Sequence, residues 1–240
     1  MKIYQENMQR LRAFYQSDYY QWLSNYDSKW LKIVREALYN DPDKYDVNLY
    51  KALAAKYHLP QKRCNLLDNV SNHSIKLSAD VVCGSKQLEM LHPDFKDWIL
   101  DYENIRSNIN LHFLWPQHKV PTINTYRYTI YRDRIDYLLY DLKCYFTGQL
   151  TPMSKAYQND NTKIWLQQFD HNFPNFVKKL RFENFVNINF EVLDIEFGQK
   201  QVVRGNLERL QVNAKDKTAL KQYLEQLLQL NIKGRFSIAK

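Results

Sequence analysis

Two arginines and an aspartate recur at seven-residue intervals in the segment 123–148, at positions Arg127, Arg134 and Asp141. The apolar spacing of this segment predicts one uninterrupted helix, in which a seven-residue interval returns a side chain to the same face, here close to the apolar stripe. We therefore expect the three charged groups to be buried at least in part. A buried guanidinium needs carboxylates, phosphates or carbonyls around it, so all three should have partners.

This charged seam, with Asn124 at its entrance, allows two interpretations. In the first, Asn124, Arg127 and Arg134 hold the phosphate of a nucleotide or nucleic acid, and Asp141 belongs to the same ligand site. In the second, the seam is an internal ion-pair network that fixes the helix in the fold. If both arginines are fully paired with internal carboxylates, their burial is explained without a bound ligand.

Asp133 and Asp136 lie three residues apart on the same predicted helix and could hold a metal ion together with Asp141. Aspartates beside arginines are more often ion-pair partners, and helical spacing puts Asp136, with Arg132 and Lys143, on the solvated face. We therefore predict no metal site and no cofactor. Because the chain also lacks a glycine-rich phosphate loop and the common hydrolase motifs, a binding protein is favoured over an enzyme.

Residues 53–70 have the apolar spacing of a helix-turn-helix, with His58 where a turn glycine often stands. The second helix would present side chains that reach phosphates and base edges in a major groove: Gln61, Lys62, Arg63 and Asn65. The alternative is an ordinary helical hairpin.

A second candidate surface for nucleic acid lies in the phenylalanine-rich segment 173–186, where Lys178, Lys179 and Arg181 are interleaved with the aromatic residues. Aromatic rings with nearby cations can stack bases. Alternatively, the phenylalanines serve the core and the cations are solvated, as their helical spacing favours.

His112 follows Arg106 by five residues, a spacing used by helical ribonucleases of the HEPN class, in which a histidine moves a proton beside a phosphate-binding cation. The alternating pattern of residues 108–115 instead predicts a strand, with His112 as a satisfied side chain on a sheet face.

The composition favours a soluble, cytoplasmic protein with an anionic partner. The net charge of +8 is concentrated in two flanks: residues 1–64 carry eleven basic and seven acidic side chains, and residues 171–240 carry twelve and seven. Such flanks suit nucleic acid or an acidic protein surface. No apolar run approaches a membrane span or a signal peptide, so we expect no membrane association. Cys64, Cys83 and Cys144 are far apart and are expected to be reduced, mostly buried thiols.

Periodicity predicts a mainly helical α+β fold, with helices packed around a small antiparallel or mixed sheet. Strands are expected at 74–83, 108–115 and 188–197, and helices at 5–25, 30–38, 47–57, 92–106, 161–169, 173–186 and 218–230, with a short one after Thr151. Asp216 should cap the last of these helices. We divide the chain into a helical N-terminal part (1–72), a core α+β domain (73–215) and a C-terminal helix and tail (216–240).

The central stretch resembles an uncharacterised bacterial family of unknown function whose hallmark is Ile-Asn, then an arginine, then a helix with an Asp-Arg-x-Asp core. The matching positions, preceded by Trp115 and Pro116, are Ile123, Asn124, Arg127, Asp133, Arg134 and Asp136. The similarity runs from about Ser74 to Asn189 and departs at Tyr128, where the family tends to have glycine. The segments on either side look like additions. The resemblance implies a fold and a bacterial or mobile-element origin, but no reaction.

The expected function is that of a basic binding protein that recognises nucleic acid or a nucleic-acid-handling complex, in phage defence or anti-defence. One alternative is a nuclease or nucleotide-processing enzyme that uses the Arg/Asp seam, with an aspartate or His112 assisting. Another is a protein-interaction module such as an inhibitor, which would use exposed tyrosines and the leucine-rich last helix. The sequence gives no indication of the oligomeric state.

Overall fold

The computed structural model describes residues 42–61, 65–82, 112–117 and 123–232. Within these ranges the strands are β1 (Leu66–Val70), β2 (His73–Val81) and β3 (His112–Pro116). The helices are α4 (Pro42–Tyr57), α7 (Ile123–Tyr131), α8 (Ile135–Phe146), α9 (Ser154–Tyr157), α10 (Asp160–Gln167), α11 (Phe173–Lys179), α12 (Leu207–Asn213) and α13 (Lys217–Ile232), with a 3₁₀ turn at Glu183–Phe185. The predicted mainly helical α+β class is confirmed.

The three strands form one antiparallel sheet in the order β1-β2-β3. A tight turn joins β1 to β2 through Ser71 and Asn72, whose φ angles of 47° and 66° are those of the left-handed turns that suit a twisted hairpin. The strands predicted at 74–83 and 108–115 correspond to β2 and β3. The boundary expected after residue 72 falls inside this hairpin.

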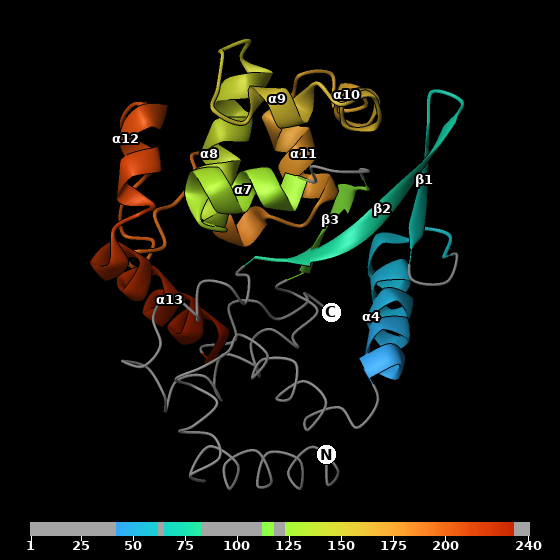
Figure 1. Cartoon of the computed structure of the whole chain (residues 1–240), viewed down its shortest axis with the longest axis horizontal. Helices are drawn as coiled ribbons and strands as arrows, with labels where there is room; N and C mark the ends of the chain where they lie inside the picture. The colour runs from blue at the N-terminus through green and yellow to red at the C-terminus, as the bar shows by residue number, and fades with distance from the viewer. Residues whose placement is uncertain (1–41, 62–64, 83–111, 118–122, 233–240) are drawn as a thin grey trace, which may run out of the picture.

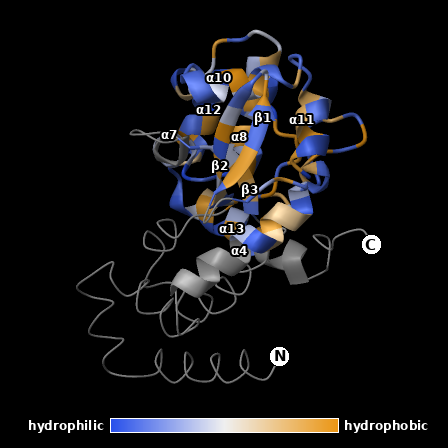
Figure 2. Ribbon diagram, turned by 90° about the vertical axis from the view of Figure 1, so that its right-hand side faces the viewer, coloured by the Kyte–Doolittle hydropathy of each residue, from blue (hydrophilic) through white to orange (hydrophobic). Residues whose placement is uncertain are grey.

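The helices α7 to α11 lie together on one side of the sheet (Figure 1). Helix α4 lies apart from them, next to the lower end of β1 in this view. Apolar residues recur along the strands in front of α8 (Figure 2). The core between them is largely aromatic: the rings of Trp115 and Trp165 are 5.5 Å apart, and those of Phe169 and Phe176 are 5.1 Å apart. The phenylalanines of α11 therefore serve the core, as one of the two interpretations of that segment predicted.

The predicted strand at 188–197 is wrong. This segment forms only isolated bridges, Val186 to Val192 and Leu193 to Val202. The Asn187 carboxamide accepts hydrogen bonds from the backbone N–H groups of Asn189 and Glu191, both at 2.9 Å, and Phe190 adopts a φ of 55°. The chain therefore turns where a strand would continue, and the third strand of the sheet is β1.

The predicted helix-turn-helix is also wrong. Helix α4 ends at Tyr57, and His58 takes the left-handed φ of 53° that a glycine would take. After this turn the chain is extended: Gln61 forms a bridge with Leu66, where β1 begins. Pro60 favours an extended conformation in the residue before it, which does not suit the start of a second helix there. Neither Gln61 nor Asn65 lies on a recognition helix, and Lys62 and Arg63 lie outside the described residues.

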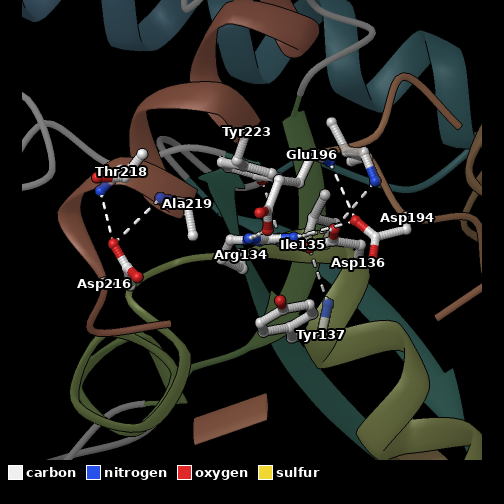
Figure 3. A network of polar contacts seen from close by, with 11 residues as sticks. Arg134, Ile135, Asp136, Tyr137, Asp194, Glu196, Asp216, Thr218, Ala219 and Tyr223 are labelled. Atoms are coloured by element: carbon white, nitrogen blue, oxygen red, sulfur yellow. Dashed lines mark hydrogen bonds and ion pairs between the residues drawn. The ribbon is translucent and has the colours of Figure 1, made fainter. Parts of the chain in front are cut away.

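The C-terminal helix belongs to the core. Asp216 caps it, because its carboxylate accepts hydrogen bonds from the backbone N–H groups of Thr218 (2.8 Å) and Ala219 (3.4 Å), as Figure 3 shows. The leucine stripe of α13 is buried at Leu220 and Leu224, as is Leu227. These leucines pack on the rest of the fold and are not free to dock a partner.

Several expectations lie outside the described residues: the helices at 5–25, 30–38 and 92–106, Arg106, Cys64 and Cys83. Cys144 is a buried free thiol, as predicted. Across the part of the chain that the structure covers, no helix combines the length and the apolar character needed to cross a membrane.

Candidate functional site

The helix predicted over 123–148 is interrupted, and the interruption organises the site. Helix α7 ends at Tyr131, Arg132 and Asp133 adopt left-handed φ angles of 49° and 61°, and α8 begins at Ile135. Left-handed backbone is costly for residues other than glycine, although aspartate tolerates it better than most. We attribute the persistence of this turn to the ion pairs that its neighbours form, because each side of the break places one arginine in a carboxylate cluster.

Arg134 lies at the centre of three carboxylates (Figure 3). Its guanidinium is fully buried and binds Asp136 through two hydrogen bonds, Nε to Oδ1 at 3.0 Å and Nη2 to Oδ2 at 2.7 Å. Nη1 donates to Glu196 Oε2 at 2.7 Å, and Nη2 lies 3.4 Å from Asp194 Oδ1. Burial would lower the pKa of Arg134, but the charge of Asp136 and these hydrogen bonds raise it above the ordinary value, so the arginine stays charged.

Two tyrosine rings enclose the same guanidinium. The Arg134 Cζ atom lies 3.9 Å from the ring centre of Tyr137 and 4.6 Å from that of Tyr223, a residue of α13. The Tyr223 hydroxyl accepts a hydrogen bond from the Ile135 backbone N–H at 3.1 Å and donates to the Val82 carbonyl at 3.3 Å. The start of α8, the end of β2 and α13 are thus tied together around Arg134.

Arg127 forms the second cluster, on the other side of the break. Its Nη2 atom lies 2.8 Å from Asp80 Oδ2, on β2, and 3.2 Å from Asp133 Oδ1, and its guanidinium lies over the Phe113 ring at 5.1 Å. The side chain is 1% exposed. The left-handed turn is what brings Asp133 back toward Arg127, since an uninterrupted helix would carry it further round the axis.

Asp141 is buried without a cation. Its Oδ2 accepts from the Tyr131 hydroxyl at 2.7 Å and from the Met153 backbone N–H at 3.3 Å, and its Oδ1 accepts from the Tyr157 hydroxyl at 2.7 Å. Burial raises the pKa of Asp141, and the hydroxyl donors, including Thr151, oppose that rise. The predicted burial of Arg127, Arg134 and Asp141 is confirmed, and each has internal partners.

The expected solvent exposure of Asp136 is wrong, because the break in the helix rotates it inward, where it is completely buried against Arg134. Asp133, Asp136 and Asp141 do not converge: the first pairs with Arg127, the second with Arg134, and the third with tyrosine hydroxyls. Among the described residues, no three His, Cys, Asp or Glu side chains are placed to hold a metal ion.

The remaining predicted residues are scattered. Lys179 binds Asp68 at 3.2 Å and also contacts Gln168, and Lys178 lies over the Phe190 ring. Arg181 is exposed just after α11.

His112 is a buried residue of β3, as the strand prediction required, and not a helical residue of a ribonuclease motif. Asn124 lies in the first turn of α7, but its side chain is outside the described part.

A groove of about 570 Å³ lies next to the Arg134 cluster. Its lining contains Asp194 and Glu196 of that cluster together with three cations, Lys200, Arg204 and Arg209. The other lining residues are Tyr137, Phe197, Gln201, Val202, Leu210 and Asn213. None of the three cations forms an ion pair with a described residue, in contrast to Arg127 and Arg134.

The sequence reasoning did not identify this groove. Its cations come from an irregular segment and from α12, which has no strong periodicity to reveal it. The available signal was local: Asn206 caps α12 by accepting a hydrogen bond from the Arg209 backbone N–H at 2.8 Å, and Gly205 precedes it with a φ of 125°. Such a Gly-Asn pair before a helix marks the turn that carries Arg204 and Arg209 to the same cavity.

The fold and the clusters define a mainly helical α+β domain with buried ion pairs. The chain belongs to the family of unknown function DUF6994, whose model matches residues 24–235. The match extends beyond the resemblance at 74–189, so residues 24–73 and the C-terminal helix are part of the family and not additions. The chain matches no curated protein and no solved structure.

Proposed function

We propose that this protein binds single-stranded nucleic acid in the groove beside Arg134. The observation that carries the proposal is that three cations that pair with no described residue, Lys200, Arg204 and Arg209, line one cavity. Phe197, which is 49% exposed, lines the same cavity. Unpaired cations bind phosphates, and an exposed ring beside them offers a base a surface on which to stack.

The pairing of the other arginines supports this choice of site. Arg127 and Arg134 were the phosphate-binding candidates of the enzyme alternative, and internal carboxylates account for both. A phosphate at Arg134 would have to displace a carboxylate from a buried, bidentate contact. The three cations of the groove form no ion pair with a described residue, so a ligand phosphate there need not displace a bidentate carboxylate.

A single strand fits the groove better than a duplex does. In a duplex the bases are stacked on each other and present only their edges, so an exposed phenylalanine would have no base face to contact. In a single strand each base has a free face. The carboxamides of Gln201 and Asn213, which also line the cavity, can bond to sugar and base groups.

The salt dependence of binding tests the proposal. Each phosphate neutralised on a single strand contributes a slope of about −0.7 to the plot of log affinity against log salt, so three cations predict about −2. Between 50 and 200 mM salt, this slope corresponds to a loss of affinity of about twenty-fold. Fluorescence anisotropy with end-labelled eight-nucleotide strands measures it. The double variant Arg204→Ala/Arg209→Ala should lose only about threefold over the same range, with a slope of about −0.7.

The matched control is Lys178→Ala/Arg181→Ala, which removes two cations from the other predicted surface and should leave the slope near −2. No measurable affinity for any strand at 50 mM salt would end the proposal. If the slope becomes less negative in the control and stays near −2 in the groove variant, the binding site lies at α11 and not in the groove. A role in phage defence or anti-defence depends on this binding. The cytoplasmic location is a separate proposal that this experiment does not test.

A further inference from the structure

We infer that the groove selects guanine, with the two donors on the guanine edge bound by Asp194 and Glu196 while Lys200, Arg204 and Arg209 hold the adjoining phosphates. This inference rests on the proposed nucleic-acid binding and adds a base preference to it. It concerns the carboxylates of the groove, which the binding of phosphate does not use.

The two carboxylates are held in place but are not fully used. Each gives one oxygen to Arg134: Glu196 Oε2 accepts from Nη1, and Asp194 Oδ1 lies near Nη2. Asp194 Oδ1 also accepts from the Glu196 backbone N–H at 3.1 Å. Their second oxygens, Asp194 Oδ2 and Glu196 Oε1, accept no hydrogen bond from any residue the structure describes. Both side chains line the groove, and that of Glu196 is only 10% exposed.

Arg134 therefore holds both carboxylates at the groove. The two carboxylates are anchored on neighbouring nitrogens of one planar guanidinium, which is itself bound by Asp136 and lies between two tyrosine rings (Figure 3). A group held in this way loses little conformational entropy when it binds a ligand. Arg134 thus has a structural role in positioning these two carboxylates, and this role requires no contact between Arg134 and a phosphate.

Guanine is the base whose pairing edge complements two adjacent acceptors. Its N1–H and N2–H₂ groups are neighbouring donors, whereas adenine and cytosine place a ring-nitrogen acceptor beside their amino group. Uracil and thymine have one donor between two carbonyls. A carboxylate facing an acceptor is repelled, so each of the other bases would leave at least one oxygen unsatisfied.

The cations of the groove exclude the simpler ligand for a carboxylate pair, an amine. A cationic amine near Asp194 and Glu196 would share the cavity with Lys200, Arg204 and Arg209 and be repelled by them. A guanine nucleotide is neutral at the base and anionic at the phosphate. Its charge distribution therefore matches both parts of the lining.

The test compares strands that differ in one base. Eight-nucleotide uridine strands carry guanosine, inosine, adenosine or uridine at the fifth position and are titrated by anisotropy in 50 mM salt. The titrations are done at pH 8, because burial raises the pKa of Asp194 to about 7 and the carboxylate must be ionised. The guanosine strand should bind about tenfold more tightly than the adenosine strand, and inosine, which lacks the 2-amino group, should fall between them.

Glu196→Gln sharpens the test, because it keeps the size of the side chain and reverses its outward group. The glutamine oxygen must face the Arg134 donor, so its NH₂ group turns toward the ligand and opposes the guanine donors. The guanosine preference, taken as the ratio of the guanosine-strand affinity to the adenosine-strand affinity on the same variant, should fall to about twofold or less. Glu208→Gln is the control, since it makes the same charge change on an exposed residue of α12 that does not line this groove.

The outcomes separate the two proposals. If no strand binds, the proposed function fails. If all four strands bind equally, nucleic-acid binding stands and guanine selection is overturned. A guanosine preference that survives Glu196→Gln also overturns it, since the base would then be recognised elsewhere. Competition with GMP and AMP shows whether the guanine ligand is a free nucleotide or part of a strand. If GMP displaces the strand at concentrations near the strand Kd, the ligand is a mononucleotide. If displacement is weak but GMP still competes better than AMP, the ligand is a strand.

Discussion

Replacing Arg134 with methionine tests whether the buried cluster holds the break between α7 and α8. Methionine roughly fills the volume between the Tyr137 and Tyr223 rings but brings no charge and no donors. Asp136, which is completely buried, then loses both of its guanidinium hydrogen bonds, and Glu196 and Asp194 lose theirs. Three carboxylates remain close together with no cation among them.

Removing one partner of a buried ion pair costs about 3–5 kcal/mol, because the other charge is left uncompensated. We expect Arg134→Met to lower the free energy of unfolding by about this amount at pH 8, which is a fall in Tm of about 6–20 °C for a chain of this size. The loss should depend on pH. Burial raises the pKa of Asp194 to about 7 although the charge of Arg134 opposes the rise, so without the arginine the pKa of Asp194 should rise further.

Groups whose pKa is raised on folding contribute stability below their unfolded pKa and lose it as the pH rises through the folded pKa. The deficit of Arg134→Met should therefore be largest at pH 8 and shrink toward pH 4–5, where Asp194 is protonated. Urea unfolding followed by circular dichroism at both pH values measures it. Arg181→Met is the control: this arginine also has a left-handed φ, of 59°, but its side chain is exposed and lies in neither carboxylate cluster. A loss below about 1 kcal/mol at pH 8, or one that does not change with pH, would refute the argument.

Three further predictions concern the other buried polar groups. Burial raises the pKa of Asp194 to about 7, so the ionisation of this group destabilises the fold as the pH rises through that value. Asp194→Asn should therefore have a higher Tm than wild type at pH 8.5. At pH 4.5 the two Tm values should be the same. Tyr131→Phe removes the 2.7 Å hydrogen bond to Asp141 and should cost about 1–3 kcal/mol in urea unfolding, and a neutral result would mean that Asp141 is satisfied without it. Lys179→Met should cost less than about 1 kcal/mol, because the Lys179 side chain is 43% exposed; a larger loss in the same assay would show that Asp68 depends on that charge.

The elements that the sequence predicted well are those whose pattern is local. Alternation identified β2 and β3, and the position of Asp216 identified the start of α13. The wrong predictions occur where a side chain or backbone conformation redirects the chain. The Asn187 turn replaces the strand at 188–197, and the left-handed Arg132 and Asp133 interrupt the central helix. A helical residue and a left-handed one need not differ in hydrophobicity, so periodicity does not detect the change.

The sequence by itself determined that Arg127, Arg134 and Asp141 are buried and need partners. Three polar residues beside an apolar stripe are carried into the core by the leucines and tyrosines around them, whatever the partners are. Only the tertiary structure decided which groups those partners are. Asp194 and Glu196 are 60 and 62 residues from Arg134 in the chain, and no local pattern ties them to it. The same packing decided that these arginines are structural and that three cations which pair with no described residue lie in the groove beside them. Pairing is a property of distance in space and not of spacing along the chain.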